Sequence, residues 1–257
     1  MTASDRATLY VVCTPIGNLA DISQRALEVL GRVEALACED TRHSRRILDH
    51  HGLARPPVVL SCHEHNEAAA AQRILGLLRD GRSVALISDA GAPGINDPGY
   101  RVITAAVEAG LPVQVIPGPS AVITALLCSG LPTAGFAFKG FPPRKSAQRR
   151  SLLSAEAERA ETLIFFESPH RLAALLADAA AVLGDRPAAV CLELTKLHER
   201  VERGGLAELA AGFEGRRIKG EATVVIAGQS RKEAQEKKRA RAREDRKARQ
   251  KDRQDRS

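Results

Sequence analysis

The chain has few aromatic residues and no long apolar run. Only 3% of its 257 residues are aromatic, and Trp is absent. An apolar fraction of 44% still suffices for a core, which we expect to consist of Ala, Leu, Val and Ile. No run approaches the roughly 18 apolar residues of a membrane span, and the N-terminus lacks the pattern of a signal peptide. These absences predict a cytoplasmic protein that does not enter a membrane.

Cysteines at the spacing of a disulfide framework or a zinc site are missing as well. The five cysteines are widely spaced, odd in number and without a CxxC pair. The one cluster of metal-ligand types, Cys62-His63-Glu64-His65, has no second ligand group at a recognisable spacing. We therefore expect neither a disulfide framework nor a metal.

The net charge of +7 is confined to one end of the chain. Residues 230–257 hold 13 Lys or Arg against 6 Asp or Glu, an excess that equals the charge of the whole chain. This tail has Ala as its sole apolar type and cannot bury a core. One interpretation of the tail is a solvated extension. Because the rest of the chain has no net charge, we favour the second interpretation, an arm that binds a polyanion.

Strand-like and helix-like runs alternate from the start, which predicts βαβ units and a mainly parallel sheet. In the first part we expect strands over 8–13, 35–38, 57–61, 83–88 and 113–116, and helices over 22–31, 44–51, 67–80 and 100–109. In the second part we expect a mixed sheet with strands over 136–141, 162–166, 188–194 and 221–227, and helices over 120–129, 147–157, 168–183 and 206–213. The sequence thus predicts an α/β protein with an N-terminal domain over 1–117, a C-terminal domain over 118–228 and a basic tail over 229–257.

The most informative segment runs from Ser88 to Tyr100, directly after an apolar strand. Its glycines let the backbone approach a ligand, and its prolines hold the loop rigid. In open α/β sheets ligands lie outside the carboxyl ends of the strands. The loop is not GxGxxG, so a dinucleotide is not the first expectation.

Four further segments accompany this loop, each at the end of a predicted strand or before one. They are Thr14-Pro15-Ile16-Gly17-Asn18-Leu19, Glu39-Asp40-Thr41-Arg42, Pro117-Gly118-Pro119-Ser120-Ala121 and Lys219-Gly220-Glu221. Together the five segments resemble the ribosomal RNA small subunit methyltransferase I family of the tetrapyrrole methylase superfamily, from about Leu9 to Gly228. The loop departs from that pattern at Ala92 and Gly94, where relatives often carry Thr and a bulkier residue.

The resemblance implies transfer of a methyl group from S-adenosylmethionine to the ribose 2′-oxygen of a cytidine in 16S rRNA of the small ribosomal subunit. It also implies two α/β domains with the cofactor in the cleft between them, and a homodimer. The cofactor contacts that it implies are Pro15, Asp89, Ala90, Gly91, Ala92, Ile95, Ser120, Ala121, Phe166 and Leu192.

For the chemistry the sequence leaves several candidates. The candidates for removing the proton of the hydroxyl or stabilising its oxygen are Glu39, Asp40, His63, Glu67 and Lys196. The sequence does not show which of them is the base. The candidates for RNA contact are Asn18, Arg42, Arg144, Lys145, Arg149, Arg150 and Lys219.

Plainer structural interpretations stay open for most of these residues. Asp89 can cap its loop, Glu39 and Arg42 can form a structural ion pair, and the cluster from Arg144 to Arg150 can be a solvated helix face. Two other functions also stay open: a tetrapyrrole methyltransferase and a non-catalytic RNA-binding protein of the ribosome. The basic tail and the basic cluster favour RNA over a macrocycle.

Deletion of residues 229–257 is expected to weaken RNA binding, because it removes the entire excess of positive charge. The measurement is the RNA affinity of the full-length and truncated chains at several salt concentrations, with the affinity for S-adenosylmethionine as the control. Equal RNA affinities at every salt concentration would contradict the proposed arm.

Overall fold

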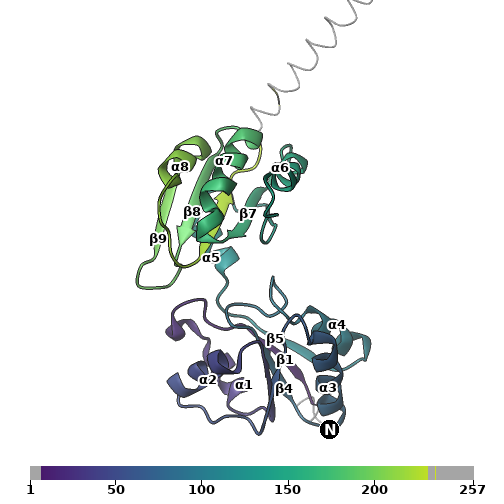
Figure 1. Ribbon diagram of the computed structural model, residues 1–257. Coiled ribbons are helices and arrows are strands. Elements are labelled where there is room, and N and C mark those ends of the chain that lie inside the picture. Colours follow the sequence, from purple (N-terminus) through teal and green to yellow (C-terminus); the bar gives the residue numbers. More distant parts are fainter. Residues whose placement is uncertain (1–6, 231–234, 236–257) are drawn as a thin grey trace, which may run out of the picture. The chain divides into compact units, whose positions relative to one another are not determined.

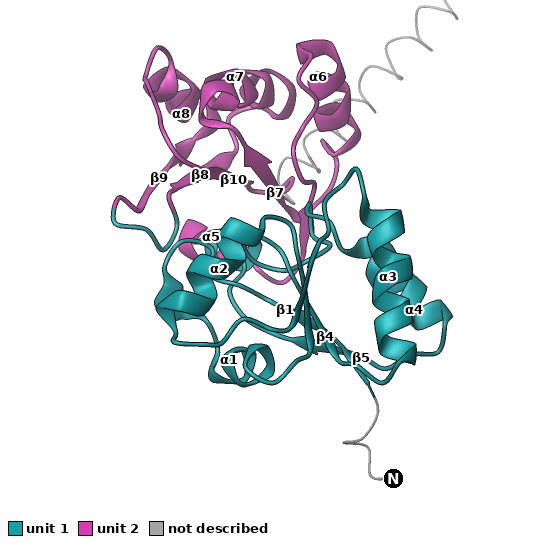
Figure 2. Ribbon diagram, turned by 60° about the horizontal axis from the view of Figure 1, so that its bottom comes forward, with its two compact units in different colours: residues 1–124, 194–197 teal, residues 125–193, 198–257 magenta. Residues whose placement is uncertain are grey.

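The computed structural model describes residues 7–230 and residue 235, so the predicted tail lies almost entirely outside the described residues. The chain forms two compact units, coloured separately in Figure 2. Unit 1 comprises Met1–Thr124 and Leu194–Leu197, and unit 2 comprises Ala125–Glu193 and His198–Ser257. The division falls inside helix α5 (Ala121–Ser129), whereas the sequence predicts a boundary before Gly118.

Unit 1 is built around a five-stranded parallel sheet with the strand order β3-β2-β4-β1-β5. Its strands are β1 (Leu9–Val12), β2 (Ala35–Cys38), β3 (Val58–Ser61), β4 (Val84–Ile87) and β5 (Val113–Ile116). Its helices are α1 (Gln24–Leu30), α2 (Thr41–His50), α3 (Glu67–Arg79) and α4 (Tyr100–Glu108), with a short 3-10 turn at Leu19–Asp21. The parallel sheet predicted for the N-terminal part is confirmed.

Helices cover both faces of this sheet (Figure 1). Successive strand residues point to opposite faces, and the core divides accordingly. Leu9 and Leu86 pack with apolar residues of α3 and α4, whereas Leu36 and Ile87 pack with those of α1 and α2. The inner strands β2 and β4 are buried on both faces and read as continuous apolar runs, which is why the sequence reveals them.

Unit 2 contains a mixed five-stranded sheet with the order β6-β7-β10-β8-β9. Its elements are β6 (Phe136–Phe138), α6 (Ser146–Ala155), β7 (Thr162–Glu167), a 3-10 turn (Pro169–Arg171), α7 (Leu172–Leu183), β8 (Pro187–Leu192), β9 (Arg200–Gly205), α8 (Leu206–Phe213) and β10 (Ala222–Ile226). Strands β6 and β7 are parallel and the other pairs antiparallel. The mixed sheet is confirmed, but β9 was not predicted, because Arg-Val-Glu-Arg-Gly-Gly carries no apolar alternation.

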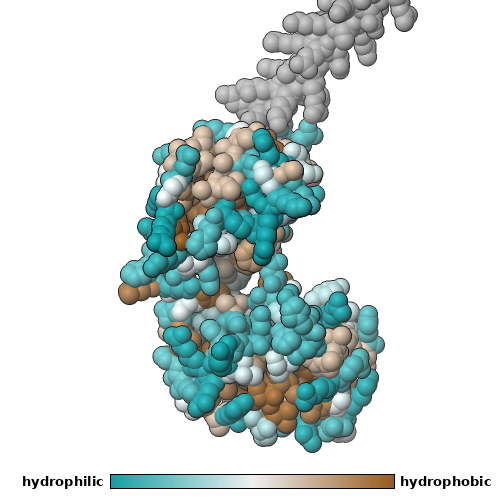
Figure 3. All heavy atoms as spheres, in the orientation of Figure 1, coloured by the Kyte–Doolittle hydropathy of each residue, from teal (hydrophilic) through white to brown (hydrophobic). Residues whose placement is uncertain are grey.

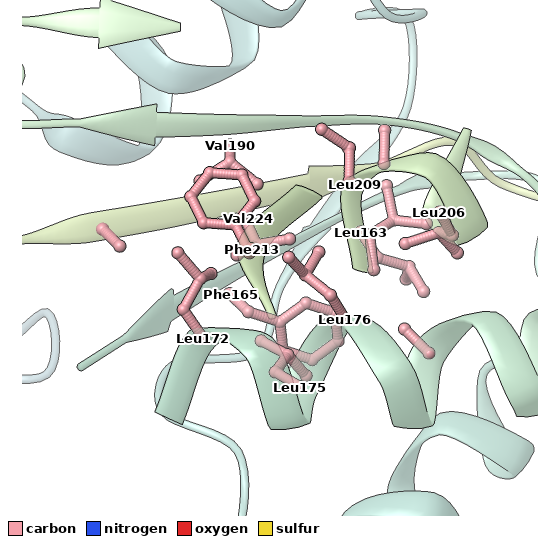
Figure 4. Close-up of a cluster of buried hydrophobic side chains, with 14 of the residues drawn as sticks. Leu163, Phe165, Leu172, Leu175, Leu176, Val190, Leu206, Leu209, Phe213 and Val224 are labelled. Carbon is pink, nitrogen blue, oxygen red and sulfur yellow. The ribbon is translucent and has the colours of Figure 1, made fainter. Parts of the chain in front are cut away.

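The core of unit 2 lies between this sheet and helices α7 and α8 (Figure 4). Phe165, Val190 and Val224 reach it from the strands, and Leu175 and Phe213 reach it from the helices. The predicted aliphatic core is confirmed in both units, with Phe165 and Phe213 as the aromatic exceptions.

Large apolar side chains also reach the surface, where Figure 3 shows brown patches among hydrophilic residues. Val107 and Val115 of unit 1 and Phe141 of unit 2 are each more than half exposed. Among the described residues, no helix has the length and apolar character needed to cross a membrane.

Replacement of Phe165 by Ala is expected to lower the free energy of unfolding by about 3–5 kcal/mol, because it removes a fully buried ring and leaves a cavity. Phe136→Ala is the matched control, since this ring lies on a strand of the same sheet and is 41% exposed; its cost is expected to be much smaller. Denaturant-induced unfolding measures both, and equal losses of stability would contradict the assignment of the core.

Candidate functional site

The carboxyl ends of the five parallel strands of unit 1 meet at one edge of the sheet, and four predicted segments follow these ends. Strand β4 lies between β2 and β1, and β1 lies next to β5. The loops that begin at Thr14, Glu39, Ser88 and Pro117 therefore leave neighbouring strands at the same edge. The structure thus brings together segments that are separated by up to about 100 residues in the sequence, at the edge where α/β proteins bind ligands.

Two of these loops are joined by backbone hydrogen bonds. The amide of Thr14 donates to the carbonyl of Gly91 over 2.8 Å, and the amide of Gly91 donates back to Thr14 over 3.1 Å. The buried hydroxyl of Thr14 donates to the carbonyl of Ser88 over 3.1 Å. Gly91 has φ of +76°, a conformation that side chains rarely adopt. The segment after β1 thus fixes the start of the predicted cofactor loop.

The rest of this loop is folded on itself. Gly99 has φ of +139°, and an added Cβ would lie 3.0 Å from the amide nitrogen of Gly94. The carboxylate of Glu67 accepts hydrogen bonds from the amides of Gly99 and Arg101 at 2.8 and 2.9 Å. Glu67, one of the predicted bases, therefore holds the end of the loop at the start of α4. On the loop, Ala90 and Ile95 are exposed and Ala92 is half-buried. Pro15, in the segment after β1, is buried.

Carboxylates gather where β2 and β4 end. Burial raises the pKa of Glu39, and the nearby charges of Asp89 and Asp97 raise it further. Burial also raises the pKa of Asp97 to about 6, partly offset by a hydrogen bond from Ser88. Asp97 was assigned no role from the sequence, although it lies in the loop that the sequence singles out. Glu39, Asp89 and Asp97 thus lie close enough to affect one another's ionisation, and such a group of carboxylates suits a cationic ligand.

The side chains of Asp40 and Arg42 bind each other. The carboxylate of Asp40 caps α2 by accepting from the amide of Arg42 at 2.8 Å and pairs with its guanidinium at 2.6 Å. These hydrogen bonds lower the pKa of Asp40 to about 2. The amide of Asp40 donates to Asp89 over 3.1 Å, which links the ends of β2 and β4. The side chain of Arg42 is 90% exposed and lies at the surface beside this edge.

His63 follows β3 at the same edge. Its backbone amide donates to the side chain of Asn66 over 2.8 Å, and its ring lies edge-on to that of His65. Its Nδ1 atom is buried, with no hydrogen-bond partner among the described residues.

The segment between β5 and α5 closes the other side of the edge. The hydroxyl of Ser120 accepts from the amide of Ile123 over 3.5 Å, as the side chain of an N-cap residue does. Ala121 is the first residue of α5. Gly118 permits close contact with Cys13, the residue after β1, because an added Cβ would lie 3.0 Å from Cβ of Cys13.

Lys196 belongs to the short strip that returns to unit 1, Leu194–Leu197. An added Cβ on Gly17 would lie 2.5 Å from Cγ of Lys196 and 2.9 Å from the carbonyl oxygen of Leu194. The amide of Asn18 donates to the hydroxyl of Thr195 over 3.1 Å, and the side chain of Asn18 caps the following 3-10 turn. Only glycine at position 17 permits this approach, which holds Lys196 against the loop that follows β1.

The predicted residues of unit 2 lie near the carboxyl ends of β7 and β8. Phe166 is half-buried, and its ring packs edge-on against Phe138 at 4.7 Å. Leu192 is buried in the core of the unit, and its backbone lies between its strand partners Ala222 of β10 and Arg200 of β9. Lys219 is exposed.

The basic cluster on α6 divides into buried and exposed members. Arg149 is 4% exposed and pairs with Asp178, which accepts from its Nε at 2.8 Å. This pair removes Arg149 from the surface patch that the sequence predicts. Arg144, Lys145 and Arg150 are exposed.

Known proteins resemble the chain over most of its length. A family model described as tetrapyrrole (corrin/porphyrin) methylases matches residues 8–210. Ribosomal RNA small subunit methyltransferase I of Micromonospora olivasterospora is 52% identical over 230 residues, 89% of this chain and 73% of that protein. Its namesake in Escherichia coli O157:H7 is 46% identical over 234 residues, 90% and 81% of the two chains.

Solved structures share the fold at lower identity. Uroporphyrin-III-C-methyltransferase from Thermus thermophilus superimposes with a TM-score of 0.62 at 25% identity, covering 86% of this chain and 94% of its own. Cobalt precorrin-4 methyltransferase superimposes with a TM-score of 0.63 at 16% identity, with the same coverage.

Replacement of Asp97 by Asn is expected to remove a pH-dependent loss of stability. Because the pKa of Asp97 rises from its ordinary value of 3.8 to about 6 on folding, the native state keeps a proton that the unfolded state has lost. Stability therefore falls as the pH rises through this window. The thermal midpoint of the variant is expected to exceed that of the wild type above about pH 6 and to converge with it below about pH 4.

Asp80→Asn, at an exposed position, is the control for the loss of one charge. A wild-type midpoint that rises relative to the Asp97 variant between these pH values would contradict the raised pKa.

Proposed function

Since the chain belongs to the tetrapyrrole methylases and, within them, to the ribosomal RNA small subunit methyltransferase I family, we propose that it methylates the ribose 2′-hydroxyl of a cytidine in 16S rRNA. S-adenosylmethionine is the methyl donor. The observation that carries the choice of substrate is the contrast in similarity. Relatives named for ribosomal RNA are 44–52% identical over 89% of the chain, whereas a structural neighbour named for uroporphyrin is 25% identical.

The residues at the carboxyl edge of unit 1 fit this cofactor. S-adenosylmethionine carries a sulfonium and an ammonium, and Glu39, Asp89 and Asp97 supply negative charge beside the loop. Its carboxylate is suited to the amides at the start of α5, which Ser120 leaves partly uncapped. Gly91 shapes the loop through its two hydrogen bonds to Thr14, and exposed Ile95 offers apolar surface for the adenosine. The roles of Phe166 and Leu192 in unit 2 stay predictions.

Methyl transfer requires the 2′-oxygen to lose its proton and to lie in line with the methyl–sulfur bond. Of the predicted bases, Glu67 is bonded to the amides of α4 and Asp40 to Arg42. Burial and the neighbouring carboxylates raise the pKa of Glu39, which makes it a stronger base than an ordinary carboxylate. We therefore propose that Glu39 is the base that accepts the proton of the 2′-hydroxyl, with His63 as the second candidate on the same edge.

Lys196 supplies positive charge in this proposal. Gly17 and Thr195 hold its segment against the loop after β1, and its ammonium can stabilise the developing alkoxide or bind a neighbouring phosphate. Exposed Arg42, Arg144, Lys145, Arg150 and Lys219 are the further candidates for phosphate contact. The homodimer and the cytoplasmic location that the resemblance implies stay predictions.

The test supplies methyl-labelled S-adenosylmethionine with small ribosomal subunits, free 16S rRNA or a precorrin. We expect label at one cytidine of the RNA, in a form that protects the adjacent linkage from alkaline cleavage. Label in the precorrin would favour a tetrapyrrole methyltransferase instead. Cofactor binding without transfer to either RNA substrate would overturn the proposal.

In the same assay Glu39→Gln is expected to lower the rate constant about 10²- to 10⁴-fold, the usual contribution of a general base. The wild-type rate should fall as the pH drops through the raised pKa of Glu39, and the variant should lose this dependence. Glu108→Gln is the control, because that side chain is exposed and is not among the charges that raise the pKa of Glu39. A variant with weaker cofactor binding but an unchanged rate constant would place Glu39 in the cofactor site and not at the proton.

A further inference from the structure

Phe141 is an exposed aromatic ring in a chain with only eight Phe and Tyr residues. It is 57% exposed, whereas Phe165 and Phe213 are buried in the core of the same unit. Such a ring at the surface leaves an aromatic face available to a ligand. Phe141 is therefore a candidate for contact with a ligand.

The ring is part of a small cluster at the end of β7. Its centroid lies 5.7 Å from that of Phe166, which itself lies 4.7 Å from Phe138, and both pairs are edge-on. Edge-on packing orients the rings relative to one another. Phe141 is thereby held next to Phe166, the residue that the resemblance assigns to the cofactor.

Two arginines hold the loop that carries Phe141. Arg171 donates to the carbonyl of Pro142 over 2.5 Å. Arg149 donates to the carbonyls of Pro143 and Arg144 at 3.4 and 3.2 Å. Arg149 is in turn fixed by Asp178 at 2.6 Å, and the side chain of Arg171 lies 3.2 Å from Glu167.

This loop is consequently rigid before any ligand binds. Pro142 and Pro143 restrict its backbone, Pro142 is buried, and two charge-assisted sets of hydrogen bonds fix its carbonyls. Directly after the prolines, Arg144 and Lys145 are exposed. One short rigid segment thus presents a ring and two positive charges to solvent.

We propose that Phe141 is a stacking platform for an unpaired base of the RNA substrate, flanked by phosphate contacts from Arg144 and Lys145. Single-stranded nucleic acid is bound by this combination of an aromatic face and positive charge. Arg149 and Arg171 are positioning residues, because they bind the backbone carbonyls of the segment that follows Phe141. The inference rests on the proposed RNA substrate, and the charge beside the ring favours a nucleic acid over a second copy of the chain.

The test measures binding of a cytidine-containing single-stranded RNA by the full-length protein at several salt concentrations. Phe141→Ala is expected to weaken binding about 5- to 150-fold, the range for loss of one stacked base, with an unchanged salt slope. Phe141→Trp should restore binding, and Phe141→Leu should not. The double substitution Arg144→Ala with Lys145→Ala should instead reduce the slope of log affinity against log salt by about 1.4.

Phe136→Ala is the matched control, because this ring is also exposed but its basic neighbour, Lys139, is paired with Glu156 at 2.7 Å. The affinity for S-adenosylmethionine and the mass in solution are measured for each variant. The proposal is overturned if Phe141→Ala binds RNA as the wild type does, if Phe141→Leu restores binding, if only cofactor affinity falls, or if only the mass changes. Failure of the wild type to bind RNA would instead contradict the proposed function.

Discussion

The paired hydrogen bonds between Thr14 and Gly91 are the contact on which the candidate site depends. They join the segment after β1 to the loop after β4 just beyond the sheet, where no strand pairing holds the chain. The hydroxyl of Thr14 adds a third bond to Ser88. The loop that we assign to the cofactor is therefore an extension of the sheet, and the positions of Asp89 and Asp97 follow from it. A ligand meets a preformed surface at this edge, which reduces the ordering cost of binding.

Much of the fold was predictable because the inner strands of the parallel sheet are buried on both faces. Apolar runs such as that of β4 and the periodic helix α3 leave no ambiguity in the sequence. Strand β9 carries charged and glycine residues, and only its pairing with β8 reveals it. The division of the chain inside α5 was equally hidden, since a continuous apolar helix gives no signal of a boundary.

For the candidate site, the sequence identified loops that the structure brings to one edge of the sheet, but not the hydrogen-bond partners of each side chain. Glu67 and Arg149 illustrate the difference. Both have the chemistry of a functional residue, but Glu67 is bonded to backbone amides and Arg149 to Asp178 and backbone carbonyls. Residue type shows what a group can do, and only its partners show whether it is already engaged. Asp97 is the converse case, because burial, which the sequence does not display, raises its pKa.

The return of Leu194–Leu197 to unit 1 has a consequence for the ancestry of such a chain. The polypeptide passes from one unit to the other within α5, again after Glu193 and again after Leu197. Neither unit is one uninterrupted stretch, so a single crossover between two genes cannot exchange either unit whole. A strip taken from another gene would also have to fit the turn around Gly17, because any larger residue at that position would collide with Lys196. The path of the backbone therefore makes the two units poor candidates for separate exchange.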